Sequence, residues 1–187
     1  MFIRQNPRPK LKALQNYFWP EMGWRRFFIY LKHRVTRLSD SPHRIALGLS
    51  FGVAASFNPY VGTHIIQACI LCYIFRANIV AGALGTIVGN PSTFPLFWWL
   101  AIITGSTILG WFGVEMTQTI SQSMDFTVLF QSALDDPLHI LLPWSVGAYV
   151  IGLIILPISY MIFYPMIKAT KLARVKLINH KRKATPS

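Results

Sequence analysis

Acidic side chains are scarce in this sequence, and charge as a whole is low. Only 13% of the 187 residues are Asp, Glu, Lys or Arg, whereas an ordinary soluble domain has about 25%. None of the 6 acidic residues lies between Ile45 and Gly110 or between Leu138 and Ile167. A buried carboxylate pair for acid–base catalysis, or an acidic proton relay, is therefore excluded from these two stretches. We expect that the protein is not an enzyme.

Cysteines, clustered histidines and phosphate-binding loops are also rare or missing. The 2 cysteines, Cys69 and Cys72, lie close together in an apolar run, which predicts buried thiols and not a disulfide framework. The 5 histidines are scattered without the spacing of a metal site, and the sequence has no Gly-x-x-x-x-Gly-Lys loop for phosphate. We expect no metal ion and no cofactor.

Apolar residues are abundant instead, and the basic residues are confined to the ends of the chain. Hydrophobic residues make up 53%, and 18 Lys and Arg against 6 acidic residues give a net charge of +12. All basic residues except Arg76 precede Ile45 or follow Ile167. Long apolar stretches with basic ends are typical of a membrane protein, because a charge at the bilayer centre costs several kcal/mol. The basic ends lack a nucleic-acid-reading module, so we expect a lipid bilayer, and no nucleic acid, as the partner.

We divide the chain into a basic N-terminal segment (1–40), a membrane domain (41–167) and a basic cytoplasmic tail (168–187). Apolar side chains recur at three- and four-residue steps from Trp24 to Leu38, which predicts an amphipathic helix. We predict that this helix lies on anionic lipids, to which each Lys or Arg adds about 1 kcal/mol. The residues assigned to this membrane surface are Trp24, Arg25, Arg26, Phe28, Arg34 and Arg37. The alternative is a helix packed on the protein itself or on a soluble partner.

The first apolar segment is divided by Asn58-Pro59. A helix over the apolar run from Ile45 to Phe57 rises about 20 Å, which is short of the roughly 30 Å hydrocarbon core. Proline removes a backbone donor and moves the preceding residue out of helical geometry, so we expect the helix to end here. A second short run then leads to Arg76, so basic residues flank both outer ends of the segment. This pattern favours a re-entrant hairpin over a straight span.

The second apolar segment repeats the plan, with Asn90-Pro91 between a small-residue run from Ile79 to Gly89 and a Trp-rich run that ends at Trp111. The stretch 112–137 that follows carries no Lys or Arg. A third apolar stretch, Leu138 to Ile167, is interrupted by three prolines, and we expect the basic tail after it to form a short, fraying helix.

The predicted fold is an all-α polytopic membrane protein. The simplest topology is a re-entrant hairpin (45–75), a broken span outward (79–111) and a span back (144–165). The positive-inside rule places both termini in the cytoplasm and the stretch 112–137 on the outer side. Four crossings, with each Asn-Pro pair at a turn, is the competing count.

Several short motifs resemble a known family. They are Ala46-Leu47-Gly48, Gly52, Asn58-Pro59, Gly62-Thr63-His64, Arg76-Ala77-Asn78, Asn90-Pro91-Ser92-Thr93 and Gly105. Over roughly residues 25 to 165 the chain resembles the bacterial membrane family named domain of unknown function 2062, which often has Gln where His64 stands. The resemblance implies a small multi-pass protein of the bacterial inner membrane. Some members are joined to glycosyltransferase-type domains.

Two functions from different classes fit these features. In the first, the two broken segments form a polar pocket for a lipid head group or small solute, because half-helix ends offer free backbone groups. The residues assigned to this binding site are Asn58, Pro59, Thr63, His64, Gln67, Asn90, Pro91, Ser92 and Thr93. In the second, the protein is a scaffold or accessory subunit of an envelope-biogenesis enzyme. For His64, Asn58 and Asn90, hydrogen bonds that merely close the breaks are an open alternative to ligand binding. The short membrane domain also predicts a homo-oligomer.

Overall fold

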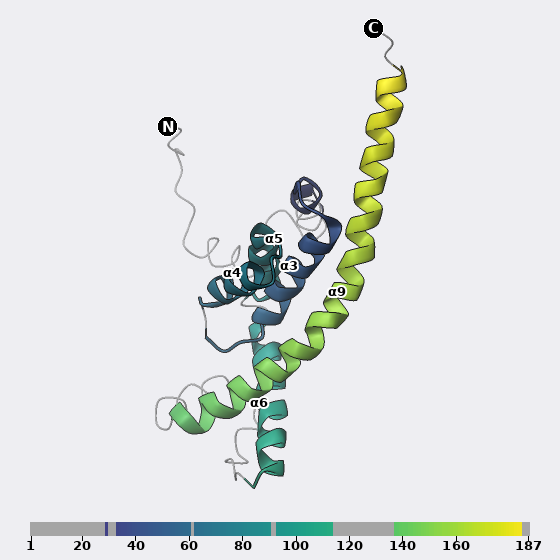
Figure 1. The fold of residues 1–187 in the computed structure, drawn as a ribbon. Helices are drawn as coiled ribbons and strands as arrows, with labels where there is room; N and C mark the ends of the chain where they lie inside the picture. The colour runs from purple at the N-terminus through teal and green to yellow at the C-terminus, as the bar shows by residue number, and fades with distance from the viewer. Residues whose placement is uncertain (1–28, 30–32, 61, 91–92, 114–136, 185–187) are drawn as a thin grey trace, which may run out of the picture.

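The computed structural model describes residue 29 and residues 33–60, 62–90, 93–113 and 137–184. Its elements are α3 (Pro42–Ala55), α4 (His64–Ile74), α5 (Ile79–Gly85), the 3-10 helix η1 (Thr86–Val88), α6 (Phe94–Trp111) and α9 (Pro137–Ala184). Figure 1 shows α3, α4 and α5 grouped together, α6 leading away from them, and α9 passing along both parts. The predicted all-α class is confirmed for the described part of the chain.

Helices α3 and α4 run antiparallel and form a helical hairpin. Ser41 caps α3 by accepting a hydrogen bond from the Arg44 backbone N–H at 3.3 Å. At the same end, the Arg44 Nε donates to the Arg76 carbonyl at 2.6 Å, just after α4. The Asn78 backbone N–H, at the start of α5, donates to the Arg44 carbonyl at 2.9 Å. The polar start of α3 therefore lies beside the end of α4 and the start of α5.

Helices α3 and α5 run parallel and touch through glycines. A Cβ added at Gly48 would lie 3.2 Å from the Gly82 backbone nitrogen, and one added at Gly52 would lie 2.7 Å from the Gly85 Cα. Glycines four residues apart on α3 and three apart on α5 allow the two helix backbones to approach this closely. Because both helices start at the same end, both also end at the same level, where the Ser56 hydroxyl donates to the Thr86 carbonyl at 3.3 Å.

Helix α9 runs antiparallel to α3 and crosses α6. The His43 Nδ1 and the Tyr160 hydroxyl are 2.7 Å apart, whereas Asn58, near the far end of α3, contacts Tyr149. At the crossing with α6, a Cβ on Gly147 would lie 2.6 Å from the Gly105 backbone nitrogen. The one long helix thus joins the hairpin to α6.

The course of α9 differs from the expected one. It is helical through Pro143, Pro157 and Pro165, and it continues past Ile167 without a break to Ala184. Each proline removes one backbone donor, but its fixed φ is compatible with a helix, and packing of buried positions such as Ala148 and Ile167 holds the helix together. The boundaries at 40/41 and 167/168 remain predictions from charge.

Two described helices are long and apolar enough to cross a membrane, by length and composition. They are Phe94–Trp111, with a mean hydropathy of 1.4, and the Ile140–Lys176 part of α9, with a mean hydropathy of 2.2. Only 17% and 22% of their most apolar windows are buried inside the protein. A core helix of a soluble protein would bury most of its apolar residues, so these helices leave apolar surface uncovered.

The close contact between α3 and α5 predicts that an added methyl group destabilises the protein at Gly52 but not at Gly110. Gly52→Ala should lower the free energy of unfolding by about 1–3 kcal/mol, because the methyl group would meet the backbone of α5. Gly110→Ala in α6 is the matched control, since nothing lies within 4 Å of the added Cβ. Thermal unfolding in detergent micelles measures both. Equal melting temperatures for the two variants would contradict the close packing.

Candidate functional site

The Asn58 side chain is the centre of the first break. It is 2% exposed, in the turn between α3 and α4. Its Nδ2 donates to the Gln67 Oε1 and to the Tyr149 hydroxyl, both at 2.9 Å. Its Oδ1 accepts from the Tyr60 backbone N–H at 3.0 Å. The amide therefore holds α4 and α9 to the turn. This is the structural role that the sequence analysis gave for Asn58 as the alternative to ligand binding.

Further hydrogen bonds extend this network towards the surface. The Gln67 Nε2 donates to the Thr63 hydroxyl at 2.8 Å, and that hydroxyl donates to the Tyr60 carbonyl at 2.7 Å. The hydroxyls of Tyr60 and Ser145 are 3.0 Å apart. Gln67 and Thr63 are half-buried, and Tyr149 is 54% exposed. The polar network thus reaches the outside of the protein between α4 and α9.

His64 lies beside this network and is 6% exposed. Its Nδ1 is 3.0 Å from the Ala55 carbonyl, and because a carbonyl only accepts, Nδ1 is the protonated nitrogen. In the neutral ring Nε2 is then an acceptor, and it is buried without a hydrogen-bond partner among the described residues. The ring lies near Phe94, with ring centroids 5.6 Å apart and the ring planes tilted by 41°. His64 therefore closes the break with one nitrogen and leaves the other open.

The second break is a separate turn. The Asn90 Oδ1 accepts from the Thr93 backbone N–H at 3.3 Å, and the Thr93 hydroxyl donates to the Val88 carbonyl at 2.7 Å. These bonds link η1 to the start of α6. Two further predicted site residues, Pro91 and Ser92, lie outside the described residues.

The two breaks lie close together, but the contact between them is largely apolar. Phe57 stacks on Phe97 with ring centroids 4.3 Å apart, and a Cβ on Gly89 would lie 2.8 Å from the Ser56 Cβ. The structure thus brings Asn58, Pro59, Thr63 and Gln67 into one polar cluster, with His64 beside it. Asn90 and Thr93 belong to their own turn. We call the first group, with Tyr60, Ser145 and Tyr149, the break cluster.

Sequence reasoning missed the contribution of α9 to the break cluster. Ser145 and Tyr149 are four residues apart, so they share one face of the helix. Two hydroxyl side chains on one face of an apolar helix are a usable signal of a polar contact. Their partners, Tyr60 for Ser145 and Asn58 for Tyr149, lie 85 and 91 residues away in sequence and could not be identified from that signal.

The structure describes two of the six predicted membrane-surface residues. Those outside the described residues are Trp24, Arg25, Arg26 and Phe28. Arg34 and Arg37 are exposed at the end of a short helical stretch, 33–36. Val35 between them is buried against Ile45 and Ile167. For this short part, packing on the protein itself is the arrangement observed.

Asp40 organises the end of the hairpin opposite the breaks. Its carboxylate accepts hydrogen bonds from the Ser41 backbone N–H at 2.9 Å, the Arg44 Nη1 at 3.0 Å and the Asn78 Nδ2 at 3.2 Å. Burial raises the pKa of Asp40. The hydrogen bonds from Asn78 and Ser41 and the positive charges of Arg44 and Lys171 outweigh this effect, so the pKa lies below its ordinary value of 3.8.

The comparison with known families identifies one family. The family described as "Uncharacterized protein conserved in bacteria (DUF2062)" matches residues 25–176. The chain belongs to the DUF2062 family. The matched range contains both breaks and most of α9, so the DUF2062 region includes the hairpin, α6 and the break cluster. No curated protein and no solved structure matches the chain.

The carboxylate of Asp40 predicts a pH-dependent stability. The pKa of Asp40 is lower in the folded than in the unfolded state. The ionised carboxylate therefore stabilises the fold fully at pH values above the unfolded-state pKa, and this stabilisation is lost as the pH falls through the folded-state pKa. Asp40→Asn should therefore lower the free energy of unfolding by about 1 kcal/mol at neutral pH. The difference from wild type should be largest at neutral pH and should shrink as the pH falls below about 4. Thermal unfolding in detergent across this range measures it, and a difference that stays constant with pH would contradict the assignment.

Proposed function

We propose that this DUF2062 protein is a small multi-pass protein of the bacterial inner membrane, with both termini in the cytoplasm. In this arrangement α3 and α4 are a re-entrant hairpin, α5 to α6 cross outward, and α9 returns. The uncovered apolar surfaces of α6 and α9 support the membrane placement. The antiparallel course of α9 along α3 and the pairing of Arg44 with the Arg76 carbonyl support the topology.

The depth of the breaks follows from helix length. A helix of 14 residues such as α3 is about 20 Å long. With Arg44 at the cytoplasmic interface, the break cluster would lie about two thirds of the way through a hydrocarbon core roughly 30 Å thick. Polar backbone and side chains at that depth are tolerated only where protein or water satisfies them, and the hydrogen bonds of Asn58 provide such partners.

We propose that the break cluster binds the polar part of a lipid or a small polar solute. The observation that carries this proposal is the His64 Nε2, an acceptor that is buried without a hydrogen-bond partner among the described residues. A buried acceptor without a partner costs about 1–3 kcal/mol, which a ligand donor would recover. Amide, hydroxyl and imidazole groups bind and orient a polar ligand, and we propose no catalytic role for them. We also propose that the protein forms a homo-oligomer and that it associates with an envelope-biogenesis enzyme.

The topology predicts a distinct labelling pattern for single cysteines. We expect Ser39→Cys to react with a membrane-impermeant maleimide only in inside-out vesicles, and Phe112→Cys only in right-side-out vesicles. Tyr60→Cys at the break should react much more slowly than both, because it would lie within the bilayer. The background for all three is Cys69→Ala with Cys72→Ala. Rapid labelling of Tyr60→Cys from the outer side would instead favour four crossings.

The binding role predicts different outcomes for two substitutions of His64. His64→Asn keeps an amide nitrogen near the Nδ1 position for the Ala55 carbonyl and removes Nε2. His64→Gln places its amide near Nε2 instead. Native mass spectrometry of protein from bacterial membranes should show a bound small molecule that His64→Asn loses and His64→Gln retains in part.

Thr107→Ala is the control for this experiment, because Thr107 is exposed on α6 and its hydroxyl, among the described residues, bonds only the Ile103 carbonyl of its own helix. It should keep wild-type occupancy. If wild-type protein carries no such molecule, or if His64→Asn retains it at wild-type occupancy, the binding proposal is wrong. A scaffold protein would tolerate His64→Asn without such a change in occupancy.

A further inference from the structure

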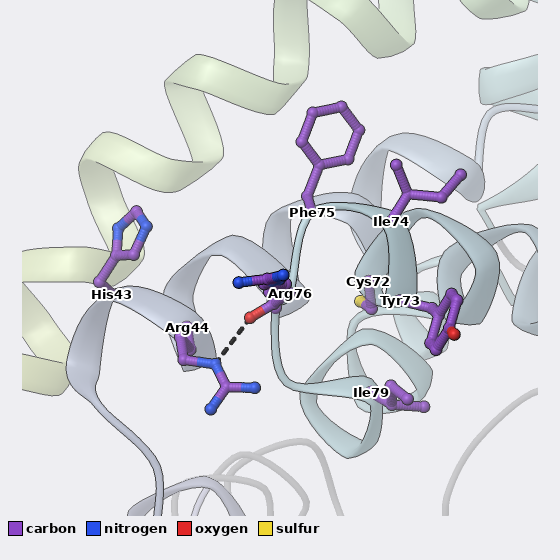
Figure 2. A pocket seen from close by; sticks show the side chains of 9 residues that line it. His43, Arg44, Cys72, Tyr73, Ile74, Phe75, Arg76 and Ile79 are labelled. Carbon is purple, nitrogen blue, oxygen red and sulfur yellow. Dashed lines mark hydrogen bonds between the residues drawn. The ribbon is translucent and has the colours of Figure 1, made fainter.

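A second candidate site lies at the opposite end of the hairpin from the break cluster. An open groove of about 850 Å³ is formed where α3 begins, α4 ends and α5 begins. Its wall includes His43, Arg44, Tyr73, Phe75, Arg76 and Ile79. Figure 2 shows Arg44 and Arg76 adjacent to one another, whereas Phe75, Ile74 and Tyr73 project away from them. The groove is thus basic on one side and apolar on the other.

Arg76 is held in an unusual backbone conformation. Its φ is +52°, in the left-handed region that favours glycine. The Arg76 N–H donates to the Tyr73 carbonyl at 3.2 Å, and the Ala77 N–H donates to the Cys72 carbonyl at 2.8 Å. These two bonds are the Schellman motif that ends many helices, with Arg76 at the position where glycine is usual. The fold alone would be served better by glycine, which points to a role for the arginine side chain.

The Arg76 guanidinium has no hydrogen bond or ion pair with another described residue. The carbonyl at the end of α4 is already bonded by the Arg44 Nε at 2.6 Å, so Arg76 is not needed to cap that helix. Arg44 itself pairs with Asp40 at 3.0 Å, and its side chain is 49% exposed. Arg76 is also the one basic residue between Ile45 and Ile167 in the sequence. An unpaired guanidinium beside a second arginine is suited to a phosphate group.

The apolar side of the groove continues along α4. Ile66, Ile70 and Ile74 recur every four residues on this helix, so they lie on one face. They are 61%, 52% and 62% exposed, and Tyr73 beside them is 79% exposed. This stripe leads from the groove towards the break. An occupant that matches both parts has an anionic head and an apolar chain.

We infer that the groove binds an anionic phospholipid, with its phosphate at the guanidinium groups of Arg76 and Arg44 and one acyl chain along Ile74, Ile70 and Ile66. The inference shares with the proposed function only the placement of the chain in a bilayer. The two sites lie at opposite ends of α3, and the break cluster uses none of the groove residues. Charge complementarity selects this occupant over a zwitterionic lipid, and the apolar stripe selects it over free phosphate.

The experiment titrates the full-length protein in detergent with phosphatidylglycerol or phosphatidylcholine and counts bound lipid by native mass spectrometry. Wild type should bind phosphatidylglycerol about tenfold more tightly than phosphatidylcholine, and Arg76→Gln should remove most of this preference. Arg37→Gln removes the same charge from an exposed position at the basic end of the chain, and it should stay within about twofold of wild type. Inorganic phosphate at millimolar concentration should not displace the lipid.

Arg76→Gly separates binding from folding. Glycine suits the positive φ at this position, so its melting temperature should be no lower than that of wild type while binding of phosphatidylglycerol falls about tenfold. His64→Asn should leave this binding unchanged, so failure of this proposal and failure at the break cluster are distinguishable. Equal affinity of wild type for both lipids, equal losses in Arg37→Gln and Arg76→Gln, or displacement by inorganic phosphate would overturn the inference.

Discussion

The close contact between α3 and α5 is the constraint on which the rest of the structure depends. Gly48 and Gly52 face Gly82 and Gly85, and the backbones approach so closely that side chains larger than hydrogen do not fit. Because the two helices run parallel in register, their basic starts lie together at one end and their Asn-Pro breaks lie together at the other. The groove at the start of α5 is a consequence of this alignment, whereas the break cluster forms where α9 meets the turn between α3 and α4.

The two ends of this helix pair differ in charge. At the basic end, Asp40 and the helix carbonyls use part of the positive charge, and the Arg76 guanidinium is left without a described partner. At the broken end, neutral amide and hydroxyl groups bond one another, and the His64 Nε2 remains open. Neutral groups suit a low-dielectric environment, because an unpaired charge there is far more costly than an unpaired hydrogen-bonding group. The distribution of charge therefore matches the proposed orientation in a bilayer.

The site could be predicted only in part from local chemistry. Asn58, Thr63 and Gln67 stand out because they are polar within an apolar segment, and the structure joins them in one network. The sequence also suggested that Asn58 and Asn90 act together, but Asn90 forms its own turn with Thr93. The groove at Arg76 was not predicted as a site, since a single arginine between two apolar runs is explained equally well by membrane topology.

By itself the sequence determined the helical class and the interruption of the helices at the two Asn-Pro pairs, because proline acts locally on the backbone. Its short motifs also determined the membership of the DUF2062 family. Tertiary structure decided what local patterns leave open. It set the parallel course of α3 and α5, and it brought the Tyr149 hydroxyl within hydrogen-bond distance of Asn58. It also kept α9 helical through its prolines. These features depend on contacts between segments far apart in the chain, and such tertiary contacts override local propensity.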